Sequence, residues 1–295
     1  MKVVVICGPT ASGKSDLALD IAENIGAEII NADSMQLYRG MDIGTAKVPL
    51  GQRRGITHHL LDVIDVDQDA NVAWYQEQAR SLIDISKKPM VIVGGTGLYI
   101  KAILDELNFP DTNPEIRDRL NREAEESGGS VLYERLERLD PLAAIAIPRE
   151  NIRRIIRALE VIEITGEPYT ANLPREESSR YPNALQFGLD TEREELNKRI
   201  DFRVDQMWES GFVEEVARLV ERGIRRGKTA QRALGYASIL RALDGEISLE
   251  EAREETKVAT RQYARRQETW FRRDARITWL GQSENRLAQI LAALG

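Results

Sequence analysis

The chain has 295 residues, of which 42% are hydrophobic and 30% charged, and its formal net charge is −7. This length allows one sizeable α/β core with room for a second small unit. The acidic balance argues against nucleic-acid binding by the whole surface, and the single cysteine, Cys7, excludes an internal disulfide and a zinc site built from cysteines. No apolar stretch reaches the ~18 residues of a membrane-spanning helix. We therefore expect no membrane association and a cytoplasmic location.

The first motif is a glycine-rich segment between an apolar run, residues 3–7, and an amphipathic run, residues 16–25. Its sequence, which matches G-x-x-x-x-G-K-[ST], is Gly8-Pro9-Thr10-Ala11-Ser12-Gly13-Lys14-Ser15. In this motif backbone N–H groups and the lysine surround a diphosphate, and the serine hydroxyl is positioned to hold Mg²⁺. An ordinary glycine-rich turn is the alternative, but every constraint of the motif is met. The segment predicts a phosphate-binding loop with Ser15 as the metal ligand.

A second buried strand is predicted at residues 28–32, directly before Asp33. Residues just past the carboxyl ends of parallel strands face the ligand, so we expect Asp33 near the phosphate loop. An aspartate here could instead cap a turn. Residues 34–49 lack a clear period, as is typical of a binding loop. Residues 58–66 predict a short edge segment of the sheet.

The next core strand, residues 90–93, is followed by Gly94-Gly95-Thr96-Gly97. In many nucleotide hydrolases the equivalent strand ends in an aspartate that helps to hold Mg²⁺. Its replacement by Gly-Gly-Thr weakens an interpretation as a motor protein or GTPase. Because glycines allow a close backbone approach, Thr96 is a candidate ligand contact.

From residue 111 to about residue 164 the apolar residues have helical spacing, and Asn113 predicts the first helix start. We interpret residues 111–183 as a helical insertion into an α/β domain formed by residues 1–110 and 184–295.

Within the insertion, Arg149, Arg153 and Arg157 recur every fourth residue, with Arg154 beside them. This spacing predicts a basic ridge on one helix face. A solvated, salt-paired face is the alternative. Glu150 and Glu160 are close enough in sequence to pair with the ridge, which would still keep a positive excess.

After a strand at residues 185–189, two capping boxes predict the starts of two long helices. They are Thr191 with Glu194 and Ser248 with Glu251. On the second helix, basic residues recur every fourth residue, at Arg253, Lys257, Arg261 and Arg265. Tyr263, Gln267 and Trp270 line an adjacent face, and such a mixture can grip phosphates and stack on unpaired bases. Aromatic residues at this spacing more often lie in the hydrophobic core, and we expect Trp270 to lie there. The last strand is predicted at residues 276–280.

Taken together, these segments resemble the tRNA dimethylallyltransferases. The matching stretches occur in the family's order and cover nearly the whole chain, at residues 8–15, 31–47, 58–62, 93–99, 157–161, 234–236 and 260–270. The stretch at residues 33–47 is far more specific than the phosphate loop, which many unrelated proteins share. The resemblance implies a P-loop NTPase-like α/β fold, with a parallel sheet flanked by helices and an all-helical insertion domain that contacts tRNA.

The resemblance also implies a reaction. A dimethylallyl group passes from dimethylallyl diphosphate to N6 of the adenosine 3′ of the anticodon, and diphosphate is released. The implied partners are dimethylallyl diphosphate and the anticodon stem-loop of tRNA, the implied cofactor is Mg²⁺, and we expect a monomer.

The family's functional residues match positions of this chain. Asp33 matches the catalytic aspartate and is the expected general base, with Lys14 and Thr96 as the other catalytic residues. Residues 8–15 and Arg203 are expected to bind the donor. The residues expected to contact tRNA are Asp33, Ser34, Met35, Gln36, Thr96, Arg117, Arg153, Arg154, Arg157 and Arg232.

Three other functions stay open at this point. A small-molecule or nucleotide kinase would share the phosphate loop, use Asp33 as the base for a hydroxyl group and transfer phosphate from ATP. A prenyltransferase acting on free adenylates would have little use for basic ridges on two helices. A non-enzymatic RNA-binding module would leave Asp33 and the phosphate loop without a role.

Overall fold

The computed structural model of the chain describes residues 2–172, 179–282 and 285–295. The chain divides into two compact units. The larger unit comprises Met1–Leu104 and Tyr181–Gly295, and the helical unit comprises Asp105–Arg180. The predicted insertion, residues 111–183, overlaps the helical unit, which begins and ends a few residues earlier.

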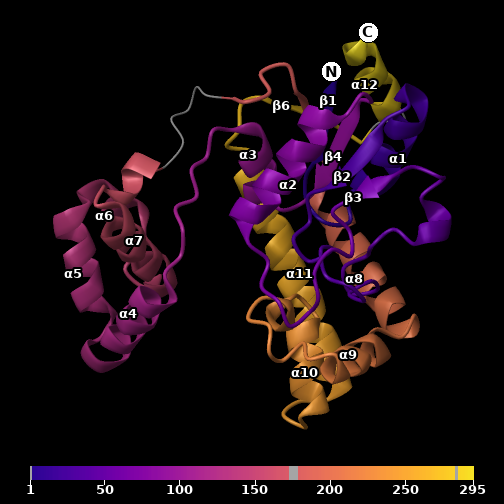
Figure 1. Cartoon of the computed structure of the whole chain (residues 1–295). Helices are drawn as coiled ribbons and strands as arrows, with labels where there is room; N and C mark the ends of the chain where they lie inside the picture. The colour runs from indigo at the N-terminus through magenta and orange to yellow at the C-terminus, as the bar shows by residue number, and fades with distance from the viewer. Residues whose placement is uncertain (1, 173–178, 283–284) are drawn as a thin grey trace. The chain divides into compact units, whose positions relative to one another are not determined.

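A six-stranded parallel sheet forms the centre of the larger unit, in the order β3-β2-β4-β1-β5-β6 (Figure 1). The strands are β1 (Val3–Cys7), β2 (Glu28–Asn31), β3 (His58–His59), β4 (Met90–Gly94), β5 (Leu185–Leu189) and β6 (Ile277–Leu280). The predicted α/β fold with a parallel sheet is confirmed. The edge strand β3 is shorter than the predicted segment, residues 58–66, because Leu60 and Asp62 have φ angles of 59° and 56°, outside the range of a strand.

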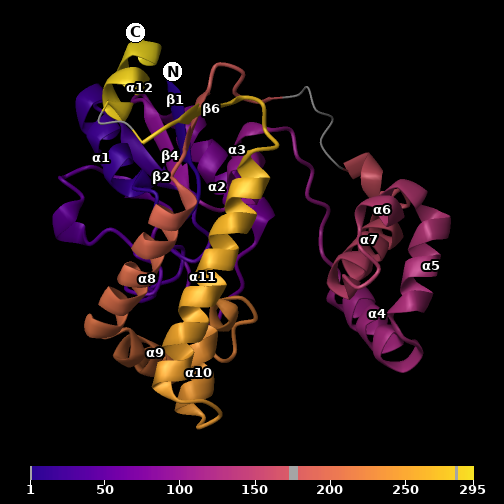
Figure 2. The same ribbon diagram turned by 180° about the vertical axis from the view of Figure 1, so that it is seen from behind.

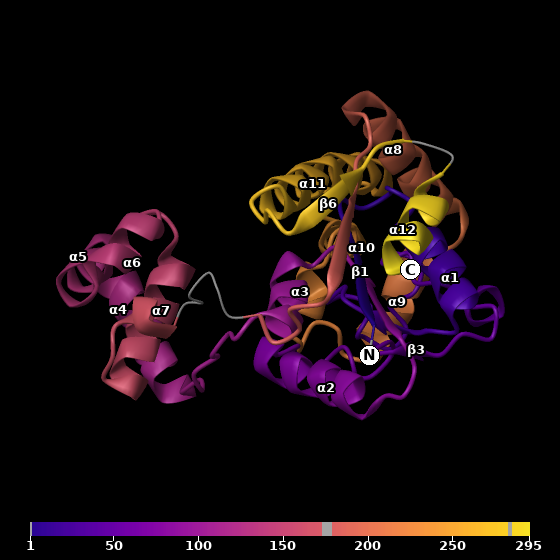
Figure 3. The same cartoon turned by 90° about the horizontal axis from the view of Figure 1, so that it is seen from above.

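Helices cover both faces of the sheet (Figure 3). Helices α1 (Lys14–Ile25) and α12 (Arg286–Leu294) pack on one face, and α2 (Val72–Ile85) and α3 (Gly97–Leu104) pack on the other. Alternate residues of β1 enter the two cores, with Val4 and Ile6 on the α1 side and Val5 on the α2 side. A strand buried on both faces is a continuous apolar run in the sequence, which is why β1 could be predicted.

Two long helices, α8 (Arg193–Glu209) and α11 (Leu249–Phe271), lie side by side (Figure 2). The predicted capping box of Ser248 and Glu251 at the start of α11 is confirmed. The predicted box of Thr191 and Glu194 is wrong, because Glu192 caps α8. The Glu192 carboxylate accepts hydrogen bonds from the backbone N–H groups of Glu194 and Glu195, at 3.0 and 2.9 Å.

Helices α9 (Phe212–Glu221) and α10 (Tyr236–Leu243) form a further layer against the long loop that follows β2. Tyr38 and Met41 of that loop are buried among them. Short 3₁₀ turns occur at η1 (Leu50–Gln52) and η3 (Ala230–Arg232). In the described part of the chain no helix has both the length and the apolar character needed to cross a membrane.

The helical unit contains α4 (Pro114–Ser127), α5 (Gly129–Leu139), α6 (Pro141–Ala146), α7 (Ile152–Thr165) and a 3₁₀ turn, η2 (Tyr169–Asn172). Its own core includes Leu120, Leu136 and Leu159. The predicted cap of α4 is confirmed, because the Asn113 side chain accepts from two backbone N–H groups of the first turn. Arg149 precedes α7, so the prediction that it shares a helical ridge with Arg153 is wrong.

Candidate functional site

Three loops of the larger unit meet at one edge of the sheet. Strands β2, β4 and β1 are neighbours and parallel, so the loops that follow them leave from the same edge. Residues from all three loops line a cavity of about 570 Å³. Lys14 comes from the phosphate loop after β1, Asp33 follows β2, and Gly95 follows β4. The topology therefore places Lys14 and Asp33, two predicted site residues from different loops, at the same cavity.

The phosphate loop has an unusual backbone at three positions. Gly13 caps α1 with a φ of 87° and Gly8 has a φ of 135°, values that glycine adopts without steric cost. Ala11 has a φ of 63°, which is strained for a residue with a Cβ atom, and such strain is concentrated at functional sites. Its methyl group packs against Leu196 of α8 and Ala264 of α11. The two long helices therefore support the strained turn.

The two serines of this loop differ in their position relative to the cavity. The Ser12 hydroxyl is buried and has no hydrogen-bond partner among the described residues, and an unpartnered buried group needs a reason. Ser15 lines the cavity in the first turn of α1, at the positive end of the helix. Ser15 therefore fits a diphosphate with its Mg²⁺ ion, whereas Ser12, Gly8 and Pro9 of the predicted loop are not among the residues that line the cavity.

Four basic residues line the cavity, namely Lys14, Lys47, Arg54 and Arg203. Lys47 and Arg54 are paired with carboxylates, whereas Lys14 and Arg203 influence each other. The Lys14 ammonium donates to the carbonyl oxygen of Pro9 at 2.5 Å. Burial and then the charge of Arg203 lower the pKa of Lys14 to about 8, while Asp33 acts in the opposite direction. Burial also lowers the pKa of Arg203, on α8, and Asp16 opposes that shift. An anion in the cavity would relieve the repulsion between Lys14 and Arg203.

Asp33 is held by its neighbours in a tight turn. Its backbone N–H donates to Oδ1 of Asn31 at 3.0 Å, and its own Oδ1 accepts from the N–H of Met35 at 2.9 Å. Burial raises the pKa of Asp33, against the lowering effects of the Met35 hydrogen bond and the Lys14 charge. A carboxylate with a raised pKa in a cavity is a candidate general base.

Thr96 joins the loop after β4 to the loop after β2. Its N–H donates to the carbonyl oxygen of Ala32 at 3.1 Å. Its Oγ1 accepts from the N–H of Ser34 at 3.1 Å. Thr96 is thus bonded to Ser34, which lies in the predicted tRNA-contacting segment, residues 33–36. The residues before Thr96, Gly94 and Gly95, line the cavity.

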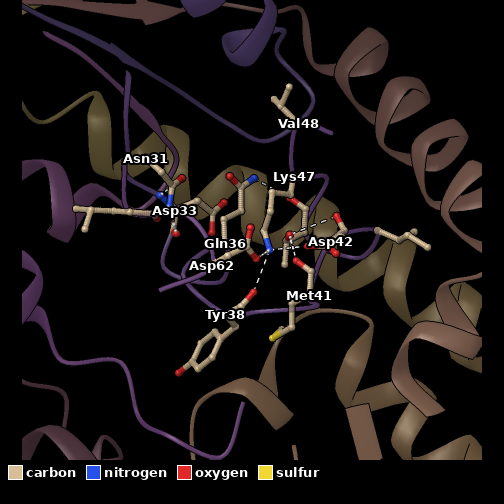
Figure 4. A network of polar contacts seen from close by, with 12 residues as sticks. Asn31, Asp33, Gln36, Tyr38, Met41, Asp42, Lys47, Val48 and Asp62 are labelled. Atoms are coloured by element: carbon tan, nitrogen blue, oxygen red, sulfur yellow. Dashed lines mark hydrogen bonds and ion pairs between the residues drawn. The ribbon is translucent and has the colours of Figure 1, made fainter. Parts of the chain in front are cut away.

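A buried lysine organises the long loop after β2 (Figure 4). Lys47 is only 7% exposed. Its Nζ donates to the carbonyl oxygen of Tyr38 at 2.9 Å and to carboxylate oxygens of Asp42 and Asp62, each at 2.6 Å. Asp33 and Gln36, two of the predicted tRNA contacts, lie beside this network. Sequence reasoning assigned no role to Lys47, although it is the last residue of the specific stretch at residues 33–47.

In the helical unit, the predicted tRNA contacts divide into two pairs. Arg117 and Arg157 both bind the buried carboxylate of Glu160, at 2.6 and 2.8 Å. Arg153 and Arg154 are exposed on α7. Two arginines share one carboxylate, so this cluster keeps one net positive charge, and contact of these arginines with tRNA stays a prediction.

In the larger unit, Arg232 is exposed on η3, whereas the basic residues of α11 are largely paired. Lys257 binds Asp205 of α8 at 2.8 Å. Arg261 binds Asp201. Ion pairs with α8 therefore account for this face better than the expected phosphate contacts do. Trp270, expected in the core, is 39% exposed.

Comparison with known proteins identifies the family. The model described as IPP transferase matches residues 36–274, and one described as isopentenyl transferase matches residues 1–68. The chain belongs to the IPP transferase family. The chain is 58% identical over 286 residues to a protein of Thermobifida fusca named tRNA dimethylallyltransferase, covering 94% of this chain and 89% of that relative.

Solved structures give the same result. A full-length tRNA isopentenylpyrophosphate transferase from Bacillus halodurans is 39% identical with a TM-score of 0.73, covering 99% of this chain and 95% of that one. A eukaryotic dimethylallyltransferase described as acting on tRNA is 28% identical with a TM-score of 0.81, covering 99% of this chain and 77% of that one. The predicted family and enzyme class are confirmed, and the kinase alternative receives no support.

Proposed function

We propose that this protein moves a dimethylallyl group from dimethylallyl diphosphate to N6 of the adenosine 3′ of the anticodon and releases diphosphate. The observation that carries the proposal is that Asp33 and Lys14 line one cavity. The reaction needs a base for the attacking amine and a cation for the departing diphosphate, and these two side chains can supply them.

The phosphate loop and its surroundings support binding of the donor. Lys14 and Arg203 provide positive charge at the cavity. Ser15 would hold Mg²⁺, which neutralises charge on the departing diphosphate. Apolar side chains that suit a five-carbon group also line the cavity, namely Leu19, Ile29, Val48, Leu61 and Val93.

The transfer step follows from this arrangement. N6 of the adenosine attacks the allylic carbon while the bond from that carbon to the diphosphate oxygen breaks, and the electron pair of that bond leaves with the diphosphate. Lys14 and Arg203 stabilise the growing negative charge. Asp33 takes the proton that N6 loses. The target base must leave its stack to reach such a cavity. Contacts to the RNA backbone would hold the stem-loop in place while the base is unstacked.

The proposal is tested with purified protein, dimethylallyl diphosphate, Mg²⁺ and an anticodon stem-loop. We expect mass spectrometry to find one dimethylallyl group on the adenosine 3′ of the anticodon, and none when ATP replaces the donor. Prenylation of free AMP but not of the stem-loop would contradict the proposal. Phosphorylation of an acceptor by ATP would also contradict it.

A second expected result concerns Arg153 and Arg154, which are exposed on α7. Replacing both by glutamine should weaken stem-loop binding and flatten the slope of log K against log salt by about one to two, because each phosphate contact releases counterions. Donor binding should not change. Arg122→Gln, at another exposed arginine of the helical unit, is the matched control. An unchanged slope in the double variant would mean that Arg153 and Arg154 are solvated and do not contact RNA phosphates.

A further inference from the structure

A buried glutamine of α11 contacts two of the loops that form the cavity. Gln267 is 5% exposed and lines the cavity. Its Oε1 accepts from the backbone N–H of Thr10, in the phosphate loop, at 2.9 Å. Its Nε2 donates to the carbonyl oxygen of Gly95, in the loop after β4, at 2.9 Å. One carboxamide group therefore spans the two loops.

The contact requires a group with one acceptor end and one donor end. A backbone N–H and a backbone carbonyl have fixed polarity, and a carboxamide offers an acceptor to the first and a donor to the second without carrying charge at any pH. The Gly95 side of the contact is also specific. A Cβ atom at this position would lie 2.0 Å from Nε2 of Gln267, so the close approach depends on glycine.

Hydrogen bonds continue from this contact to the loop that carries Asp33. Gly95 precedes Thr96, whose Oγ1 accepts from the N–H of Ser34, the residue after Asp33. A short series of bonds thus runs from the phosphate loop through Gln267 and Thr96 to the segment that carries Asp33. We propose that Gln267 is a positioning residue, which fixes the phosphate loop relative to Asp33 and so sets the distance between the donor and the attacking N6.

This inference rests on the proposed function. Kinetic measurements distinguish a positioning role of Gln267 from a role in folding alone. Reacting atoms must be held in near-attack geometry, and a misplacement of about 1 Å can cost about 100-fold in rate. If Gln267 sets that geometry, its loss should reduce the rate of the bound complex and leave both affinities nearly unchanged. A brace needed only for folding would reduce the amount of folded protein without changing the rate per folded molecule.

The first experiment compares Gln267→Met with the wild type in single-turnover prenylation of the stem-loop. We expect the rate constant at saturation to fall about 10- to 100-fold, with the Kd of dimethylallyl diphosphate and of stem-loop within about twofold. The matched control is Gln262→Met, at an exposed glutamine of the same helix, and it should keep the wild-type rate. A wild-type rate constant in Gln267→Met, or a loss found only in the Kd values, would overturn the inference.

The second experiment uses Gln267→Glu to test the polarity of the contact. An ionised glutamate would face the Gly95 carbonyl with a negative oxygen, whereas a protonated glutamate presents an O–H donor there and keeps a carbonyl for Thr10. The rate of this variant relative to wild type should therefore rise as the pH falls. A ratio that is independent of pH in a folded variant, as judged by its melting curve, would count against the role assigned to the carboxamide.

The third experiment examines the pair. Gly95→Ala should lower the rate strongly in the wild type, because the new methyl group displaces Gln267. In a Gln267→Ala background the same substitution has room and should cost much less, as expected for side chains in contact. Additive losses would contradict the inference. Wild-type protein that does not prenylate RNA would instead refute the proposed function, so the two failures are distinguishable.

Discussion

Replacing Asp33 by alanine should lower turnover by about two to four orders of magnitude, the usual contribution of a general base, while the stem-loop still binds. The physical reason is that N6 must lose a proton when it attacks, and the Asp33 carboxylate lines the cavity in which the attack would occur. Single-turnover rates and stem-loop affinities, measured on the same preparations, check both parts of this expectation.

Asp33→Asn separates the charge from the turn. The Asp33 Oδ1 accepts from the Met35 N–H, and an asparagine oxygen can accept the same bond, so this variant should keep the loop and lose only the base. It should be nearly as slow as Asp33→Ala. An Asn variant with close to wild-type rate would show that Asp33 acts through the turn alone.

The pH profile gives a third test of Asp33. Burial raises its pKa, so the carboxylate gains its proton at a higher pH than an ordinary aspartate, whose pKa is about 3.9. Because only the ionised form can act as a base, kcat/KM should fall as the pH falls through this raised pKa. In Asp33→Asn the low residual rate should lack this acidic limb.

The sequence was most informative where the structure depends on neighbours in the chain. The phosphate loop follows from its motif, β1 from an apolar run buried on both faces, and the first turn of α11 from Ser248 and Glu251. Asp33 could be assigned to the cavity because parallel topology brings the ends of neighbouring strands together. Each of these inferences needs only local pattern and general rules of topology.

Contacts between distant residues could not be predicted in this way. Gln267 binds Thr10 and Gly95, which are 257 and 172 positions away, and no local period marks such a partner. The basic residues of α11 recur every fourth residue, and this spacing is the same whether they face RNA or the acidic residues of α8, such as Asp201 and Asp205. Thr191 and Glu192 are both able to cap α8, and the burial of Thr191 is a tertiary property.

Lys14 provides the second large expected effect. Its pKa of about 8 means that the ammonium loses its proton in a pH range where most lysines remain charged. Diphosphate binding favours the charged form, so affinity for dimethylallyl diphosphate should be greatest below about pH 8. Above it, the Kd should rise by up to about tenfold per pH unit. Titrations of donor binding between mildly acidic and alkaline pH measure this directly.

Lys14→Met should abolish this pH dependence and reduce the transfer rate by about 100- to 1000-fold, the usual cost of losing one group that stabilises a developing anion. Lys14→Arg should keep positive charge throughout the range, so its donor affinity should stay level where that of the wild type declines. The control is Lys87→Met, at an exposed lysine before β4, at the opposite end of the strand from the cavity. A Lys14→Met variant whose donor Kd matches that of the wild type at every pH would mean that Lys14 is not the cation that binds the diphosphate.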